Sequence, residues 1–275
     1  WAGDEPGRQF TLVGHSMGGI VSRAYLACYP EAAQKRVKHV IMHGTPNFGA
    51  AGAVANLIHG NSMMSLAAKL NKKNVTRRLL LNMPSVYEIV PAPRDLFPSN
   101  RHYAANWDLY NAGEWELDGL RQEYLHAGAA FQKLLIESDP QVPITQIAGC
   151  NLNTIVDMQR SFGPDGKPVF HALWKEDGPD AGDGTVPLWS SVLPEATMYY
   201  IEEVHRDLPK NKKVIQATLD LIHGRTPDLD TSIPGRRAIV ERDLAPPEID
   251  AEGLKERIEA GTATEKDLQQ LFFAF

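Results

Sequence analysis

Five consecutive residues, Gly14-His15-Ser16-Met17-Gly18, form the pattern G-x-S-x-G, which can present a serine hydroxyl as a nucleophile. The serine of this pattern lies on a sharp strand-to-helix turn, at strained backbone angles, with its Oγ above a sheet. We expect glycine at 14 and 18 because a side chain there would collide with neighbouring backbone. The N–H of Met17 is the expected first donor of an oxyanion hole.

A serine hydroxyl becomes a good nucleophile only when a base lies within hydrogen-bond reach, and nine histidines compete for that role. In folds with this serine motif the chain order is serine, then acid, then histidine. His205 directly follows a predicted strand and precedes the last long helix, so we predict His205 as the general base. His43 ends a strand and could line the site. The other histidines lie in the serine turn, strands, helices or loops: His15, His39, His59, His102, His126, His171 and His223.

The imidazole in turn needs a carboxylate that orients it. Asp183 lies in Gly182-Asp183-Gly184-Thr185-Val186-Pro187, where the flanking glycines let the loop bring a carboxylate close to an imidazole. We therefore predict Asp183 as the acid. Four other carboxylates are near it in sequence or near the histidine: Asp177, Asp180, Glu202 and Glu203. The spacing of three between the aspartates differs from the alternating pattern of calcium loops, so we expect no metal and no cofactor.

Alternating apolar runs and helical patterns place these residues in an α/β fold. Residues 9–13 and 37–42 predict strands, and the helical pattern of residues 16–27 lies between them, which makes a βαβ unit and hence a parallel sheet. Further strands are predicted at 144–148 and 198–204. A helix is predicted over 211–223.

Three other segments differ from this repeating pattern. Residues 50–135 lack a convincing strand and predict helices at 63–70, 75–81 and 120–136, so we interpret them as a helical insertion that could cap the active site. Gly163-Pro164-Asp165-Gly166 predicts a hairpin between residues 154–162 and 169–175. The expected domains are a catalytic core over residues 1–224 and a linker with a helical tail over 225–275.

Composition excludes several classes of protein. A net charge of −6 and the absence of a basic run argue against nucleic-acid binding, and every apolar run is shorter than the roughly 18 residues that span a bilayer. The first residues have neither the basic start nor the apolar run of a signal peptide. Cys28 and Cys150 lie in apolar segments and are expected to be buried, reduced thiols, which favours a cytoplasmic location.

Together these motifs resemble the lecithin:cholesterol acyltransferase-like α/β-hydrolases. The resemblance covers roughly residues 9–224 and combines the serine motif with Gly44-Thr45-Pro46-Asn47-Phe48-Gly49, the Gly182–Pro187 loop and a histidine before a helix. The segment from Pro84 through Pro91 also resembles a part of the family's insertion. The resemblance implies a Ser16–Asp183–His205 triad and hydrolysis or acyl transfer on a lipid ester, with transient contact to a lipid surface.

One feature departs from the family pattern. A complete α/β-hydrolase has about four strands before the serine turn, whereas eight residues precede the first strand here, and the chain starts with Trp1 rather than Met. The absent part would supply the second oxyanion donor and a neighbour for the strand at residues 9–13, which otherwise has an unpaired edge. We therefore expect an N-terminal segment or a second chain to complete the fold.

Three functions remain open from the sequence. The first is an esterase or lipase that forms an acyl-enzyme on Ser16. The second is an acyltransferase with the same triad, which differs only in whether water or an alcohol resolves the acyl-enzyme. The third is a non-catalytic interaction module that retains the fold, against which the complete triad argues.

Overall fold

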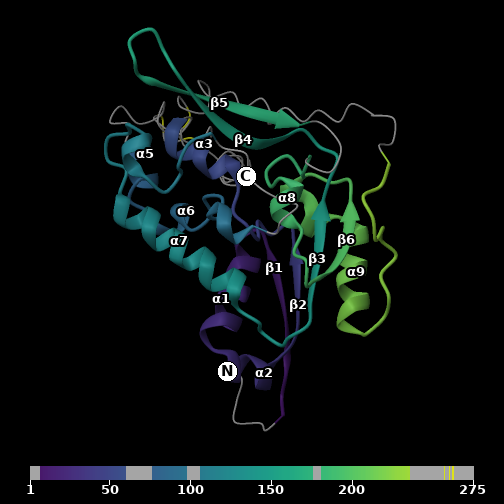
Figure 1. Ribbon diagram of the computed structural model, residues 1–275. Coiled ribbons are helices and arrows are strands. Elements are labelled where there is room, and N and C mark those ends of the chain that lie inside the picture. Colours follow the sequence, from purple (N-terminus) through teal and green to yellow (C-terminus); the bar gives the residue numbers. More distant parts are fainter. Residues whose placement is uncertain are drawn as a thin grey trace.

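The computed structural model describes residues 7–59, 76–97, 106–175 and 181–235, with residues 257, 260 and 262. At its centre lies a four-stranded sheet in the order β1-β2-β3-β6, and every neighbouring pair is parallel (Figure 1). The strands are β1 (Phe10–His15), β2 (Val37–His43), β3 (Ile144–Gly149) and β6 (Thr197–Ile201). The predicted α/β class with a parallel sheet is thus confirmed, with strand bounds that differ by a few residues.

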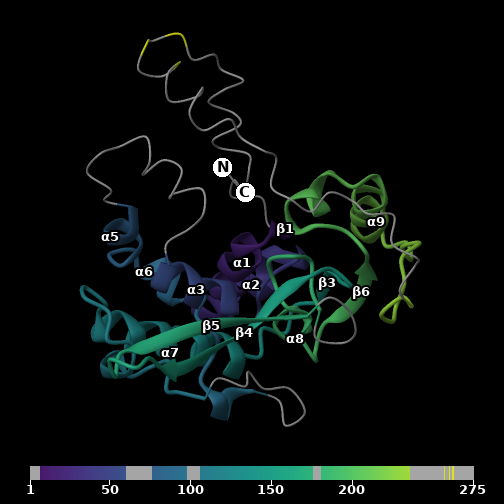
Figure 2. The same cartoon turned by 90° about the horizontal axis from the view of Figure 1, so that it is seen from above.

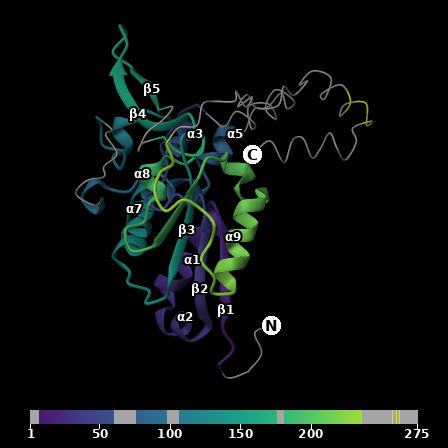
Figure 3. The same cartoon turned by 90° about the vertical axis from the view of Figure 1, so that its right-hand side faces the viewer.

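The sheet has helices on both of its faces, which explains why β2 is buried from Val40 to His43. Helices α1 (Met17–Cys28), α2 (Pro30–Arg36) and α7 (Gln122–Glu137) lie on one side of the sheet, and α9 (Lys212–Ile222) lies on the other (Figure 3). Because side chains alternate along a strand, Val40 and Met42 pack into the core on the α1 side while His43 reaches Thr218 of α9.

Particular residues explain where two of the helices begin. The Asn211 side chain accepts hydrogen bonds from the N–H groups of Lys213 and Val214, which caps the start of α9. Pro30 ends the helical run of α1, as expected, and also begins α2, where a proline loses no helical hydrogen bond. The sequence pattern did not predict α2.

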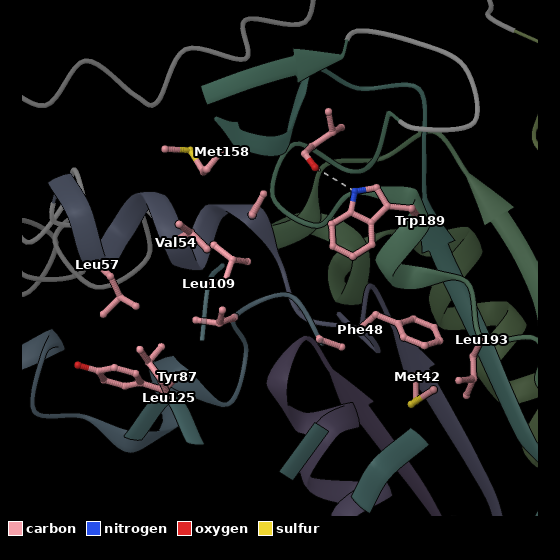
Figure 4. Packing of buried hydrophobic residues seen from close by; sticks show 14 of the residues in the cluster. Met42, Phe48, Val54, Leu57, Tyr87, Leu109, Leu125, Met158, Trp189 and Leu193 are labelled. Atoms are coloured by element: carbon pink, nitrogen blue, oxygen red, sulfur yellow. Dashed lines mark hydrogen bonds between the residues drawn. The ribbon is translucent and has the colours of Figure 1, made fainter. Parts of the chain in front are cut away.

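In the described residues between β2 and β3, all regular structure is helical. The elements before α7 are α3 (Ala51–His59), α5 (Thr76–Leu80), α6 (Pro84–Tyr87) and the 3-10 turns η1 (Arg94–Leu96) and η2 (Ala112–Glu114). One apolar core joins this segment to the sheet and includes Phe48, Leu57, Tyr87, Leu125 and Trp189 (Figure 4). The predicted helix over residues 63–70 lies outside the described residues.

An antiparallel hairpin follows β3, as predicted. It consists of β4 (Thr154–Phe162) and β5 (Pro168–Lys175). The hairpin lies at the carboxyl end of the parallel strands and extends above α3 and α7 (Figures 1 and 2). Phe170 of β5 packs against Trp107 of the insertion, with the ring centroids 4.9 Å apart, so the hairpin and the insertion share a contact surface.

Residues 225–235 follow α9 and return along the outer edge of β6. The N–H of Tyr200 donates to the carbonyl of Asp230 (2.8 Å), and the amide of Asn151 donates to the carbonyl of Pro234 (2.8 Å). The start of the segment interpreted as a linker therefore pairs with the sheet. The helical tail expected over residues 252–275 falls almost entirely outside the described residues.

The two cysteines are both free, but only one is buried. Cys150, at the end of β3, is buried as expected, and desolvation raises the pKa of its thiol to about 12. Cys28 is exposed, contrary to the prediction, because it is the last residue of α1 and lies two positions beyond the buried Leu26, on another side of the helix. Over the described residues, no helix combines the length and apolarity needed to cross a bilayer.

Candidate active site

The serine motif forms a strand-to-helix elbow between β1 and α1. Ser16 has φ 55° and ψ −125°, a region that side chains rarely adopt. A Cβ at Gly14 would lie 2.6 Å from the backbone of Gly18 and Gly19, so glycine is required at position 14. The same expectation for Gly18 is wrong, since a Cβ there would meet nothing within 4 Å. The crowded position is Gly19, where a Cβ would overlap the Thr45 side chain.

The strained backbone of Ser16 gives a prediction about stability. In the variant Ser16→Gly we expect the free energy of unfolding to rise by about 1 kcal/mol, because glycine adopts these angles without steric cost. Denaturant titration of the two proteins measures this difference. A variant that is less stable than the wild type would contradict a strained elbow.

The three residues predicted as a triad lie in one line of hydrogen bonds. Ser16 Oγ lies 2.9 Å from His205 Nε2, and His205 Nδ1 lies 2.7 Å from Asp183 Oδ2. A carboxylate oxygen only accepts, so Nδ1 carries the proton that it donates to Asp183. In neutral His205, Nε2 is then unprotonated and can accept the hydroxyl proton of Ser16. The arrangement can therefore deprotonate a serine during attack on a carbonyl.

The Asp183 carboxylate is buried, with 1% of its side chain exposed, and its other oxygen is also bonded. Oδ1 accepts hydrogen bonds from the N–H groups of Thr185 (3.0 Å) and Val186 (2.7 Å). These bonds fix the rotation of the carboxylate, so that Oδ2 faces the imidazole. Gly44 lies against this pair at φ +57°, and a Cβ there would come within 2.9 Å of Asp183 Oδ2 and 3.0 Å of His205 Nδ1. This contact explains the glycine at position 44.

Thr154, at the start of the hairpin, holds the loop that carries the acid. Its Oγ1 accepts hydrogen bonds from the N–H groups of Gly182 (3.1 Å) and Gly184 (2.9 Å), on both sides of Asp183. The N–H of Leu152 donates to the carbonyl of Gly182 (3.0 Å). Sequence reasoning missed Thr154, because nothing in a strand-forming threonine indicates which loop it will contact.

A buried arginine connects the elbow helix to two other segments. Arg23 of α1 donates to the side chain (3.2 Å) and carbonyl (3.1 Å) of Asn47 and to the carbonyl of Leu135 (2.8 Å). Asn47 in turn donates to the carbonyl of Ser191 (2.9 Å). Burial lowers the pKa of Arg23 to about 10, which leaves it charged at neutral pH. The Thr45–Gly49 segment thus acts as a junction between α1, α7 and α8 (Leu188–Ser191).

The competing residues are placed elsewhere. His39 contacts Thr145, and His171 contacts Ser161 on the hairpin. Glu203 accepts hydrogen bonds from the N–H of Val204 (3.0 Å) and from Asn211 (2.7 Å). Asp177 and Asp180 lie outside the described residues. Within the described part of the chain, no group of three or more potential ligands could hold a metal ion.

His43 lies behind the site and gives a prediction about pH. Its Nε2 donates to Thr218 Oγ1 (2.9 Å), and burial, with His15 nearby, lowers its pKa to about 4. Below the ordinary pKa of about 6.5 the unfolded chain binds a proton that the folded chain excludes, so stability falls as the pH drops from about 6.5 toward 4. We expect this loss to be on the order of 3 kcal/mol and to disappear in His43→Gln. Denaturant titrations at pH 7 and pH 4.5 test it, and an equal loss in both proteins would contradict the assignment.

A cavity of about 860 Å³ opens beside the insertion. Trp107 and Tyr110 line it together with charged residues, among them Arg94, Asp108 and Arg160. None of the three residues predicted as a triad lines it. We assign no ligand to this cavity.

The sequence of this chain is similar to those of known proteins. A family model described as a PGAP1-like alpha/beta domain matches residues 2–88. The phospholipase A(1) LCAT3 of Arabidopsis thaliana is 29% identical over 94 residues, which is 32% of this chain and 20% of that protein. The match therefore spans about a fifth of the length of this curated relative.

Two solved structures are also similar. A Tle4–Tli4 complex matches with 16% identity and a TM-score of 0.46, over 67% of this chain and 50% of that one. The Vlm2 thioesterase domain matches with 17% identity and a TM-score of 0.27, over 82% and 73%. Since both TM-scores are below 0.5, the fold assignment depends on the sheet topology and the family model. On those grounds the chain has an α/β-hydrolase fold and is similar to the lipase-type, lecithin:cholesterol acyltransferase-like proteins, as its motifs predicted.

Proposed function

We propose that this chain is the catalytic part of a serine hydrolase that cleaves a carboxylic ester through an acyl-enzyme on Ser16. The observation that carries the proposal is the pair of contacts at His205, 2.9 Å to Ser16 Oγ and 2.7 Å to Asp183 Oδ2. Residues so far apart in sequence meet at the carboxyl edge of one parallel sheet, where α/β proteins place their active sites. A non-catalytic module would have no need for all three.

In the first half of the reaction, Ser16 Oγ attacks the ester carbonyl and His205 Nε2 takes its proton. Negative charge develops on the carbonyl oxygen. The N–H of Met17, the first residue of α1, has no acceptor within its helix and is a donor for this oxygen. Collapse of the intermediate breaks the ester C–O bond. His205 gives its proton to the departing alcohol, and the acyl group remains on Ser16.

In the second half, a water molecule replaces the alcohol. His205 Nε2 removes a proton from the water as its oxygen attacks the acyl carbon. The bond to Ser16 Oγ then breaks, and the proton returns to Oγ. Asp183 stabilises the imidazolium in both halves through its bond to Nδ1. The products are an alcohol and a carboxylic acid, and the site regains its starting state.

We infer a lipid ester as the substrate from the similarity to a plant phospholipase. We also propose a domain organisation with a catalytic core over residues 1–224, a helical insertion over about 50–135 that could cap the site, and a linker with a helical tail over 225–275. The helices of the insertion share one apolar core with the sheet. The site would then meet its substrate at a lipid surface.

The open edge of β1 motivates a second part of the proposal. Among the described residues, β1 pairs only with β2, and three apolar side chains near its free edge are exposed: Val13 (49%), Met17 (40%) and Val21 (65%). We propose that a further segment or a second chain pairs with β1 and supplies the second oxyanion N–H. Backbone amides of β1 should then gain protection from hydrogen exchange when that partner is added, and unchanged exchange would count against it.

Product analysis tests the proposed reaction. The purified protein is incubated with vesicles of a phosphatidylcholine and, separately, with a soluble p-nitrophenyl ester, and the released acids are identified by mass spectrometry. Serine-dependent release of fatty acid supports lipid ester hydrolysis. Release from the soluble ester alone retains the hydrolase and removes the lipid substrate.

The same experiment separates hydrolysis from acyl transfer. An alcohol acceptor such as a sterol or glycerol is added in excess of the enzyme. A hydrolase gives free acid at an unchanged rate, whereas an acyltransferase gives a new ester at the expense of the acid. The triad is common to both outcomes, because only the group that resolves the acyl-enzyme differs.

A further inference from the structure

We propose that His15, the residue before the nucleophile, is a positioning residue for the general base and acts on it through the main chain. This inference rests on the proposed function, since it concerns how His205 is held for proton transfer. The sequence places His15 only within the serine turn. The structure places its ring beside the ring of His205, which is 189 positions after Ser16 in the sequence.

The contact between the two histidines has a defined direction. His15 Nε2 lies 2.9 Å from the carbonyl oxygen of His205. A carbonyl oxygen only accepts hydrogen bonds, so Nε2 of His15 carries the proton and donates it. The two imidazole rings are also in contact, with centroids 4.7 Å apart and planes tilted by 39°. His15 therefore touches both the ring and the main chain of the base.

This bond completes the anchoring of His205. The N–H of His205 donates to the carbonyl of Asp183 (2.9 Å), and its own carbonyl accepts from His15. The peptide groups on both sides of its Cα are thus fixed, one to the acid loop and one to the elbow. Because the side chain bonds to Ser16 and Asp183 as well, His205 is held by four hydrogen bonds to three residues, two from its main chain and two from its imidazole. Without His15, the carbonyl of His205 would lose its hydrogen bond to the elbow.

The charge state of His15 suits this role. Burial and then the neighbouring His205 lower its pKa, and together they outweigh the hydrogen bond to the His205 carbonyl and the charge of Asp183, which act in the opposite direction. Lys210 also faces it, and His43 lies close enough for the two rings to influence each other. A neutral ring beside His205 does not repel the positive charge that forms when His205 accepts the proton of Ser16. It keeps the N–H that donates to the carbonyl.

Two substitutions separate the hydrogen bond from the ring. His15→Phe keeps a ring against His205 but removes the donor, and His15→Gln keeps a donor but removes the ring. We expect His15→Phe to lower kcat for a soluble ester about tenfold with KM within twofold of wild type, and His15→Gln to recover kcat to within about threefold, the size expected for one lost hydrogen bond. His39→Phe is the matched control on the adjacent strand and should leave both constants unchanged, because His39 contacts Thr145 and no residue of the triad.

A second readout does not depend on turnover. Two-dimensional ¹H–¹⁵N spectra of the histidine rings report the tautomer of His205, which should carry its proton on Nδ1 in the wild type and in His15→Gln. In His15→Phe we expect a mixture of tautomers or exchange broadening. Wild-type kcat and spectra in His15→Phe would overturn the inference, as would equal losses of kcat in both variants. If the wild type shows no Ser16-dependent esterase activity, the proposed function fails, and the spectra still decide whether His15 orders the base.

Discussion

Replacing Ser16 with alanine should lower ester turnover by about 10⁴-fold or more, the largest effect expected of any single substitution in this chain. The hydroxyl oxygen is the atom that bonds to the substrate, and alanine has no atom that can replace it. His205 Nε2 remains free to activate water, but it then lacks the covalent route that divides the reaction into two steps. Turnover of a soluble chromogenic ester measures the loss.

Ser22→Ala is the matched control for this substitution. Ser22 lies six residues after Ser16, in helix α1, and its hydroxyl donates to the carbonyl of Gly18 (2.9 Å) rather than to the triad. Its removal should leave kcat within about twofold of wild type. Both variants should unfold cooperatively near the wild-type midpoint. Activity of Ser16→Ala within tenfold of the wild type would exclude Ser16 as the nucleophile.

Replacing Asp183 with asparagine should also lower kcat, by about 10⁴-fold, on the pattern of other serine triads. The reason lies in the two backbone N–H groups of Thr185 and Val186, which require an acceptor at Oδ1. An asparagine would keep its oxygen there and turn its NH₂ group toward His205 Nδ1. Nδ1 must then accept, so the ring proton moves to Nε2, and Nε2 can no longer accept the proton of Ser16.

The matched control is Asp207→Asn. Asp207 lies two residues after His205, is partly exposed and pairs with Lys210, without contact to the imidazole. Its charge is removed from the same region, so any long-range electrostatic effect on His205 would be present in both variants. We expect kcat to remain within about twofold of wild type. Comparable losses in the two variants would show that the local charge, rather than the hydrogen bond of Asp183, supports the reaction.

The parallel sheet and the meeting of the triad residues could be predicted because each depends on local sequence. The βαβ pattern requires short-range apolar periodicity, and Ser16, Asp183 and His205 each lie next to a chain segment whose end at the sheet edge could be recognised. The chain order of nucleophile, acid and base leaves two histidines after Asp183, and the position of His205 between a predicted strand and a helix favoured it over His223. The geometry agrees with that choice, since His205 is the histidine, among those whose side chains the structure describes, that hydrogen-bonds to both Ser16 and Asp183.

The supporting contacts could not be predicted, because they join residues that are distant in sequence and chemically ordinary. Thr154 holds the acid loop across 28 positions, and Arg23 reaches Leu135 across 112. The sequence around Thr154 indicates only a residue in a strand, and the sequence around Arg23 indicates only a charged residue in a helix. Gly18 was assigned the crowding that belongs to Gly19, because the constraint comes from Thr45 on the neighbouring segment rather than from the serine motif itself.

The central claim is that Ser16 is made nucleophilic by His205, and its most direct test is the rate at which an alkyl fluorophosphonate labels the protein. Intact-mass and peptide mass spectrometry should show one equivalent on the peptide that contains Ser16, and His205→Ala should slow its formation by at least about 10³-fold while the protein stays folded. Labelling of another residue, or an unchanged rate in His205→Ala, would contradict the account.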